Sequence, residues 1–284
     1  MDVVGNGFLA GILSRIGSAH PGVTVLAAGV STGVQVPESD YLREADLVRA
    51  VARRCRSEGR LLVYPSTASA GMYGAPGCAG REDEDLVPAS RYGWHKLEME
   101  QLIRDSDADY LILRLGNVTG PGQPRHQLVP ALIDQLLSGR VTVHRAAYRD
   151  LVDAADVAGL THALLTAGAV REVVNISSGM PVPIEMILRR LECGLGVHPE
   201  HEYVDAPSGR YAVSLAKLRR LVPGAAAVGF GPYYYRAVID RYLAAQTPGV
   251  QTSDAHTADA LAAGASSPSG GEISNFSDVR ILMG

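Results

Sequence analysis

The chain has 284 residues, 46% of them hydrophobic and 20% charged, a composition typical of a soluble globular protein with a large core. Its formal net charge of -4 and its scattered Lys and Arg residues argue against a nucleic-acid surface, and no apolar run is long enough to span a bilayer. The cysteines are far apart and indicate neither a disulfide framework nor a metal site; they are Cys55, Cys78 and Cys193. Because the N-terminus lacks a secretion signal, we expect a cytoplasmic protein with no metal and no membrane or nucleic-acid partner.

The first motif is a glycine-rich turn. Residues 1–4 are a short apolar start, and residues 5–10, Gly-Asn-Gly-Phe-Leu-Ala, follow them and open a helical stretch. This fits Gly-x-Gly-x-x-Ala, in which glycines let the backbone approach a pyrophosphate at a helix N-terminus. A glycine turn that merely joins a strand to a helix would have a similar sequence. The cofactor-binding residues predicted from the pattern are Gly5, Gly7, Phe8 and Ala10.

The next apolar segment, residues 23–31, has the pattern of a strand and carries Leu-Ala-Ala at 26–28. A dinucleotide-binding fold has an acidic residue about 20 positions after its glycine turn, which holds the adenosine ribose. This chain has no Asp or Glu between Gly11 and Glu38. Arg15 is one candidate for binding a 2′-phosphate in that region.

Residues 41–56 have the apolar stripe of an amphipathic helix. Glu44 lies on this helix, and its carboxylate could donate or accept a proton close to the site. A solvated charge on the helix surface is the more common state of such a residue, so the sequence favours that interpretation.

Residues 61–96 carry the most informative chemistry. The apolar run 61–64 predicts a buried strand, and Ser69 follows at its C-terminal end, where parallel sheets place their ligands. Farther along, the pattern becomes helical, so Tyr92 and Lys96 lie one turn apart on one face. A neighbouring ammonium lowers the pKa of a phenol from its usual value of about 10. Tyr92 could therefore exchange a proton with a substrate oxygen to which Ser69 donates a hydrogen bond.

Two other interpretations apply to this stretch. Taken alone, Tyr-x-x-x-Lys is common on solvated helix faces.

Residues 75–89 contain a run of charged side chains between glycines and a proline, which predicts a mobile surface loop. The position of this loop just before Tyr92 could make it a lid, but a merely solvated loop is the favoured interpretation.

The order of these segments resembles the extended short-chain dehydrogenase/reductase family, which includes the NAD-dependent epimerases and dehydratases. In that family a strand ends in a Ser-rich segment that closes with Tyr-Gly, here at residues 73–74, and Tyr-x-x-x-Lys follows at about this distance. The resemblance implies that Ser69, Tyr92 and Lys96 are the catalytic residues. It also implies that Tyr92 and Lys96 contact the cofactor.

The resemblance further implies a shortened fold. Residues 23–31 are similar to the family's fourth strand, which lies under the cofactor, so Ala27 and Ala28 are expected cofactor contacts. The family's second and third strands, and the helix between them, have no apparent counterpart in this sequence. The helix after the first strand must then lie on the other face of the sheet or form a crossover of the rarer left hand. In relatives a position near Glu44 often carries Asn.

Two later blocks point to substrate-binding residues. Residues 109–123 resemble a buried strand followed by the family's Asn-Val-Tyr-Gly-Pro-Gly-Gln, with Thr in place of Tyr, and imply that Asn117 contacts the substrate. Residues 149–157 are similar to Arg-Asp-Phe-Val-x-Val-x-Asp-Val, whose Arg commonly contacts the diphosphate of a sugar nucleotide. Arg149 suits that role because a guanidinium grips phosphate with two parallel hydrogen bonds, although a salt bridge to a nearby Asp is the alternative. Weaker pocket candidates are Arg114 and His126.

The blocks together predict an α/β protein with a truncated Rossmann-like parallel sheet of about five strands, ordered 1-4-5-6-7 in the family's numbering, and a small C-terminal substrate lobe. Residues 1–177 are the expected core, with 117–150 contributing to the lobe, which residues 178–246 complete. Residues 247–284 are rich in Ala, Ser, Gly, Pro and Thr and are expected to be a disordered tail.

The resemblance implies an NAD(P)-dependent oxidoreductase or epimerase that acts on a hydroxyl or keto carbon of a sugar nucleotide. The sequence does not choose between NAD and NADP. Two alternatives stay open: an NADPH-dependent ketoreductase acting on a natural-product ketone, and a non-catalytic binding protein that lost its adenosine subsite. Family members often dimerise through the helices that match residues 41–56 and 92–104, so a homodimer is possible.

Overall fold

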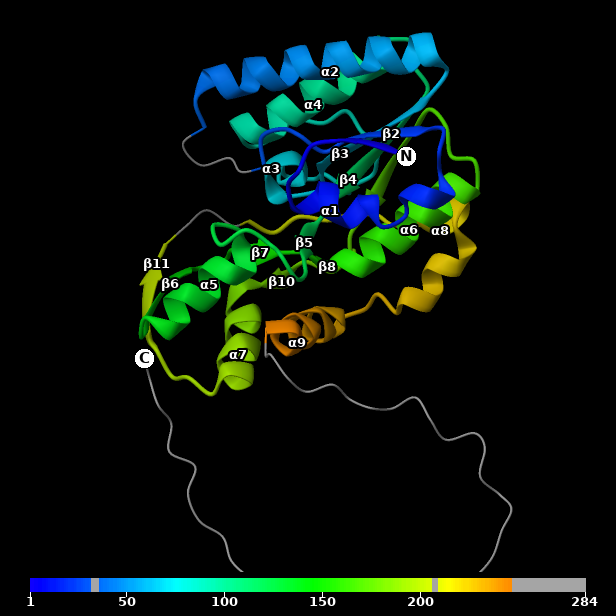
Figure 1. The fold of residues 1–284 in the computed structure, drawn as a ribbon. Coiled ribbons are helices and arrows are strands. Elements are labelled where there is room, and N and C mark those ends of the chain that lie inside the picture. Colours follow the sequence, from blue (N-terminus) through cyan, green and yellow to red (C-terminus); the bar gives the residue numbers. More distant parts are fainter. Residues whose placement is uncertain (32–35, 206–208, 247–284) are drawn as a thin grey trace, which may run out of the picture. The chain divides into compact units, whose positions relative to one another are not determined.

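The computed structural model of the chain has a parallel sheet of five strands at its centre (Figure 1). Across the sheet the strands follow the order β1 (Asp2–Val4), β2 (Val23–Leu26), β3 (Leu61–Thr67), β4 (Tyr110–Leu115) and β9 (Glu172–Ile176). The structure describes residues 1–31, 36–205 and 209–246, and the tail predicted for 247–284 lies outside them. The prediction of an α/β fold with about five parallel strands is confirmed.

The central strands are buried on both faces, which explains their nearly continuous apolar sequences. In β3 every residue after Leu61 is buried. This strand is longer than the apolar run 61–64 from which it was predicted, and it passes through Pro65. Because β2 pairs with β3 only as far as Val63, the N–H that proline lacks is not needed on that side.

Helices cover both faces of the sheet (Figure 1). On one face α1 (Phe8–Ser14) packs beside α6 (Ala154–Thr166), and Leu13 joins the core formed with the strands. On the other face α2 (Glu38–Glu58) packs against α4 (Arg91–Arg104), with Val48 and Met99 in the shared core. Each face therefore has its own apolar core against the same five strands.

The connection through α1 differs in hand from the two that follow it. The chain moves in one direction across the sheet from β1 to β2 to β3, yet α1 and α2 lie on opposite faces. The crossovers through α2 and α4 share one face and one hand, so the crossovers through α1 and α6, which lie on the other face, have the opposite hand. Since parallel crossovers are right-handed in nearly all proteins, a first crossover whose hand differs from that of the next two is one of the two outcomes that the shortened order predicted.

A second apolar core lies beyond the ends of the sheet strands. It is built from α5 (Leu128–Leu137), β6 (Arg140–His144), α7 (Ile184–Leu195) and α9 (Tyr234–Gln246), with β11 (Glu200–Val204) paired to β6. Short paired strands connect the two regions: β5 (Asn117–Thr119) with β8 (Leu151–Asp153), and β7 (Tyr148–Arg149) with β10 (Val182–Pro183). The remaining helices are α3 (Ala70–Tyr73), α8 (Ala216–Leu221) and the 3-10 turns Gly17–Ala19 and Pro223–Val228. The boundary predicted at residue 177 stays a prediction.

A buried polar network holds the end of the sheet together. The guanidinium of Arg114 donates to Glu100 at 2.7 Å and to the hydroxyl of Tyr73 at 2.9 Å, and that hydroxyl donates to Asn175 at 2.8 Å. Arg114 is 1% exposed, so it is a core residue and not the pocket residue suggested by the sequence.

The loop at residues 75–89 is also tied to this network, because the amide of Asn175 donates to Gly80 O and its backbone N–H donates to Glu82. Glu82 is buried. The prediction of a merely solvated loop is therefore wrong for this part of it, since burial of a charged side chain fixes the loop against the sheet.

Candidate active site

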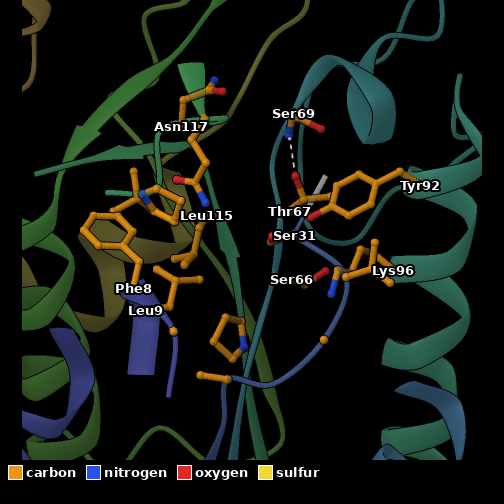
Figure 2. Close-up of a pocket in the computed structure, with 18 of the residues that line it drawn as sticks. Phe8, Leu9, Ser31, Ser66, Thr67, Ser69, Tyr92, Lys96, Leu115 and Asn117 are labelled. Carbon is orange, nitrogen blue, oxygen red and sulfur yellow. Dashed lines mark hydrogen bonds between the residues drawn. The ribbon is translucent and has the colours of Figure 1, made fainter. Parts of the chain in front are cut away.

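A pocket of about 540 Å³ opens at the carboxyl ends of the sheet strands, as expected for a parallel α/β sheet. Its walls come from the turn after β1, the segment after β2, the end of β3, the start of α4 and the segment after β4. Figure 2 shows Phe8, Leu9 and Leu115 on one side, facing Tyr92 and Lys96 on the other. An apolar wall opposite a polar wall suits a flat ring that must meet a proton donor.

The three predicted catalytic residues all line this pocket (Figure 2). Ser69 precedes α3 at its N-cap, and its hydroxyl has no hydrogen-bond partner within the described part of the chain. Tyr92 and Lys96 lie on α4, whose first turn is fixed by Ser90, because its Oγ accepts a backbone hydrogen bond at 3.0 Å. The helical spacing therefore turns the phenol and the ammonium toward the same cavity as Ser69.

Lys96 is anchored by Glu44 from the opposite helix, α2. Its ammonium donates to Glu44 Oε1 at 2.7 Å and to the hydroxyl of Tyr64 at 3.2 Å. Glu44 is 3% exposed, so the interpretation of this residue as a solvated helix charge is wrong. Burial by itself would raise the pKa of Glu44, but hydrogen bonds from His95 and Lys96 and the charge of Lys96 overcome it and lower the pKa to about 2.

Tyr92 lies beside this ion pair, with Lys96 Nζ 5.7 Å from the centroid of its ring. Burial raises the pKa of Tyr92, the charge of Lys96 lowers it, and the charge of Glu44 raises it again. The net pKa is above the usual value for a phenol. Lys96 does lower the pKa of Tyr92, as expected, but the expectation of a lowered pKa is wrong for the site as a whole, because burial and the charge of Glu44 together outweigh the charge of Lys96.

The predicted cofactor residues divide into two sets. The set that lines the pocket is Gly7, Phe8, Ala27, Ala28, Tyr92 and Lys96. Gly5 and Ala10 are not among the lining residues. Arg15 is exposed at the C-cap of α1, the end of the helix away from Gly7, so the structure gives it no contact with this pocket.

The two glycines of the turn do different things. Gly5 has φ +129°, and a Cβ there would lie 2.5 Å from Ala27 O, so this position needs glycine to pack the turn against the end of β2. A Cβ at Gly7 would have no atom within 4 Å, although Gly7 borders the pocket. The space beside Gly7 leaves the backbone open to a ligand, which fits a dinucleotide whose pyrophosphate lies against the turn.

The predicted substrate residues, Asn117 and Arg149, also line the pocket. Asn117 donates to Asp150 O at 3.2 Å, and Arg149 donates to Tyr148 O at 2.7 Å. Arg149 has no carboxylate partner within the described ranges, so the alternative of a salt bridge to a nearby Asp is wrong. His126 is exposed and also lines the pocket. Arg149 thus gives the pocket an unpaired positive charge.

Sequence reasoning missed two residues of the site, Tyr64 and His95. Tyr64 Oη donates to Glu44 at 2.7 Å, and His95 lies 2.9 Å from the second oxygen of the same carboxylate. In the sequence Tyr64 belongs to an apolar run and His95 lies between Tyr92 and Lys96, so neither position predicts a polar role. That His95 and Lys96 contact the same carboxylate is visible only in the tertiary structure.

The sequence model of the NAD dependent epimerase/dehydratase family matches residues 13–177. The chain is also similar to dTDP-6-deoxy-L-talose 4-dehydrogenase (NAD(P)(+)) from Kitasatospora kifunensis, with 31% identity over 223 residues, 72% of this chain and 68% of that protein. The family match begins after the glycine turn, so it is independent of that motif.

Solved structures show the same fold. MoeE5, solved in complex with UDP-glucose and NAD, matches with a TM-score of 0.69 and 20% identity over 86% of this chain and 98% of that chain. RMD from Pseudomonas aeruginosa, solved with NADPH, matches with a TM-score of 0.69 and 19% identity over 85% and 97%. The loss of two family strands stays a prediction. The residue pattern, the fold and these similarities agree that this chain belongs to the NAD-dependent epimerase/dehydratase family and is an NAD(P)-dependent enzyme.

Proposed function

We propose that this enzyme oxidises or reduces a hydroxyl or keto carbon of a sugar nucleotide, with Tyr92 moving the proton. The observation that carries the proposal is the presence in one pocket of Ser69, Tyr92 and Lys96 together with Arg149, whose guanidinium has no carboxylate partner among the residues that the structure describes. The first three residues supply proton-transfer chemistry, and the fourth supplies affinity for an anion. The relative from Kitasatospora kifunensis is a dehydrogenase of a nucleotide sugar, and MoeE5 was solved with UDP-glucose and NAD; the finer roles below are our assignment.

The proton steps follow from the groups present. In the reductive direction Tyr92 gives its phenol proton to the carbonyl oxygen while the carbon receives a hydride. Ser69 donates a hydrogen bond to the same oxygen, where negative charge develops. A bound nicotinamide supplies the hydride or accepts it. In the oxidative direction the phenolate of Tyr92 takes the hydroxyl proton, and an epimerisation would combine both directions on one substrate.

Lys96 has one N–H left after its bonds to Glu44 and Tyr64. That donor is available to the ribose of the cofactor, as expected from the family resemblance. The apolar wall formed by Phe8, Leu9 and Leu115 would cover one face of the nicotinamide ring and exclude water from it (Figure 2).

The substrate class follows from Arg149. A guanidinium that lines a pocket without a carboxylate partner binds phosphate oxygens well, with two parallel hydrogen bonds. This supports a substrate with a diphosphate and gives no support to a neutral natural-product ketone. Asn117 also lines the pocket and would hold a sugar hydroxyl.

The test is turnover of a defined sugar nucleotide. The full chain is incubated with NAD or NADP and dTDP-6-deoxy-L-talose or UDP-glucose; absorbance at 340 nm reports reduced cofactor, and chromatography of the sugar nucleotide reports epimerisation without net reduction. We expect turnover of at least one substrate, lost in Tyr92→Phe with cofactor affinity nearly unchanged. Unchanged turnover in Tyr92→Phe would refute the assignment of the proton to this residue.

We also propose a homodimer that uses the outer face of α2 and α4. A groove between these helices is lined by Tyr41, Leu42, Met99 and Leu102, and Leu42 is 61% exposed. Light scattering should give twice the mass of one chain, and Leu42→Glu should lower the measured mass to that of a monomer.

Within the described ranges no helix has the length and apolar character needed to cross a bilayer. The cytoplasmic location stays a prediction.

A further inference from the structure

The carboxylate of Glu44 is held by four donors. Oε1 accepts from Lys96 Nζ and from Tyr64 Oη, each at 2.7 Å. Oε2 accepts from the backbone N–H of Val30 at 2.8 Å and from His95 Nε2 at 2.9 Å, and His95 must be the donor because an ionised carboxylate only accepts. A buried carboxylate with this many donors is ionised.

The local backbone is shaped around this carboxylate. A Cβ on Gly29 would lie 2.4 Å from the carboxyl group of Glu44, so only glycine lets the segment after β2 approach it. That segment lines the pocket beside Ala27 and Ala28. Glu44 therefore joins α2, α4, β3 and a wall of the pocket, and its place in the site is built into the fold.

The positive and negative charges nearest Tyr92 cancel each other when Tyr92 itself is neutral. The titratable groups that face it come from three elements; they are Lys96 and His95 on α4, Glu44 and Tyr41 on α2, and Tyr64 on β3. Lys96 and Glu44 form a buried ion pair whose charges cancel. If Tyr92 lost its proton, the buried cluster would carry a net negative charge, which is costly in an environment of low polarity. If Glu44 were neutral, the same phenolate would neutralise Lys96.

We propose that Glu44 is a positioning residue that anchors Lys96 and offsets its charge, so that Tyr92 stays a neutral phenol at neutral pH and the site is built to give a proton to a keto oxygen. This inference rests on the proposed function and adds its direction: reduction proceeds at neutral pH. Oxidation needs the phenolate, so its rate should rise with pH toward and beyond the usual phenol value of about 10.

The ionisation of Tyr92 can be measured without substrate. The full chain is labelled with [13Cζ]tyrosine, the Tyr92 signal is assigned by its loss in Tyr92→Phe, and its chemical shift is followed from pH 6 to pH 10. We expect no ionisation in the wild type over this range. In Glu44→Gln the pKa should fall by about one unit or more, because the charge of Lys96 is no longer offset, so the signal should begin to ionise at a lower pH than in the wild type when the titration is continued above pH 10. A Glu44→Gln signal that ionises at the same pH as the wild-type signal would overturn the inference.

Further variants separate charge from structure. Glu44→Asn is a second neutral variant in case glutamine does not fold in place of a group with four donors, and it should show the same fall in pKa. Glu44→Gln combined with Lys96→Met should return the Tyr92 signal to wild-type behaviour, and a fall that persists in this double variant would contradict a role through Lys96. Glu98→Gln, on an exposed carboxylate of α4, is the matched control and should change nothing.

The two proposals fail in different ways. A wild-type Tyr92 that ionises below pH 10 would overturn this inference and leave the proposed function intact. Retained turnover in Tyr92→Phe would overturn the proposed function whatever the titration shows.

Discussion

Ser66 and Ser69 lie three residues apart, but only the hydroxyl of Ser66 is hydrogen-bonded to another side chain: it donates to Glu100 Oε1 at 2.6 Å. The hydroxyl of Ser69 has no partner within the described part of the chain and lines the pocket. We expect Ser69→Ala to lower turnover by about 10²- to 10³-fold without changing the melting temperature, because only a reacting oxygen loses a donor.

The matched control is Ser66→Ala. It should destabilise the fold by about 1–3 kcal/mol, because buried Glu100 loses a donor, while the folded enzyme keeps its turnover. Thermal unfolding and turnover of both variants check the pair. If Ser69→Ala destabilised the fold as Ser66→Ala does and kept full turnover, the assignment of Ser69 would be wrong.

Loss of the Arg149 guanidinium should lower the affinity for the substrate and leave the stability of the fold unchanged. We expect Arg149→Gln to weaken binding of a sugar nucleotide or of its nucleoside diphosphate by about 10- to 100-fold, the loss of one charge-assisted contact. Isothermal titration calorimetry measures this without turnover. Arg125→Gln is the control, because that side chain is 86% exposed and pairs with Asp134. Equal affinity in Arg149→Gln and the wild type would remove the diphosphate assignment.

The two glycines of the turn should separate folding from cofactor binding. Gly5→Ala places a Cβ 2.5 Å from a backbone oxygen at φ +129°, so the melting temperature should fall by several degrees. Gly7→Ala meets no protein atom, so the melting temperature should hold while NADH and NADPH bind more weakly. Differential scanning fluorimetry and cofactor titration check both. Unchanged cofactor affinity in Gly7→Ala would place the pyrophosphate elsewhere.

Glu44 should give the protein a defined sensitivity to acid. Its pKa is lowered from 4.5 to about 2 in the fold, so the carboxylate stabilises the folded state above pH 4.5. This stability, roughly 3 kcal/mol, is lost as the pH falls through the folded pKa toward 2. Urea unfolding at pH 6 and pH 3 should show this loss in the wild type and in Glu98→Gln, and a smaller loss in Glu44→Gln. The same loss in all three would contradict the role of Glu44.

The residues with regular spacing were predictable from the sequence. Buried strands appear in the sequence as apolar runs, so the position of Ser69 after a strand was predictable from local pattern. A helix places residues four apart on one face, so the shared direction of Tyr92 and Lys96 was predictable too. Asn117 and Arg149 were reached through the family resemblance. All five line the same pocket.

The partners of these residues were not predictable in the same way. Glu44 sits on an amphipathic helix, and nothing in that helix shows that Lys96 of another helix lies 2.7 Å away. Burial of a charge depends on tertiary packing, for which a single sequence has no periodic signal. The direction of the pKa shift of Tyr92 was wrong for the same reason, since that shift is set first by burial and then by all neighbouring charges, Glu44 among them, and both depend on tertiary packing.

The topology was open for a related reason. The order of the segments predicts which strand follows which. It allows α1 to lie on either face of the sheet, and each face gives the crossover a different hand. Only the packing of Leu13 against α6 and the sheet decides between the two faces. Pro65 likewise belongs to β3 because β2 has already ended beside it, which local sequence cannot show.

The proposed activity depends most on one binding event, the entry of a nicotinamide dinucleotide into the pocket between Gly7 and Tyr92. Titration of the full chain into NADH and into NADPH, followed by nicotinamide fluorescence, measures it directly. We predict a saturable change with at least one of them, weakened in Gly7→Ala and preserved in Tyr92→Phe. If neither cofactor gives a saturable change at millimolar concentration, the proposed activity is contradicted.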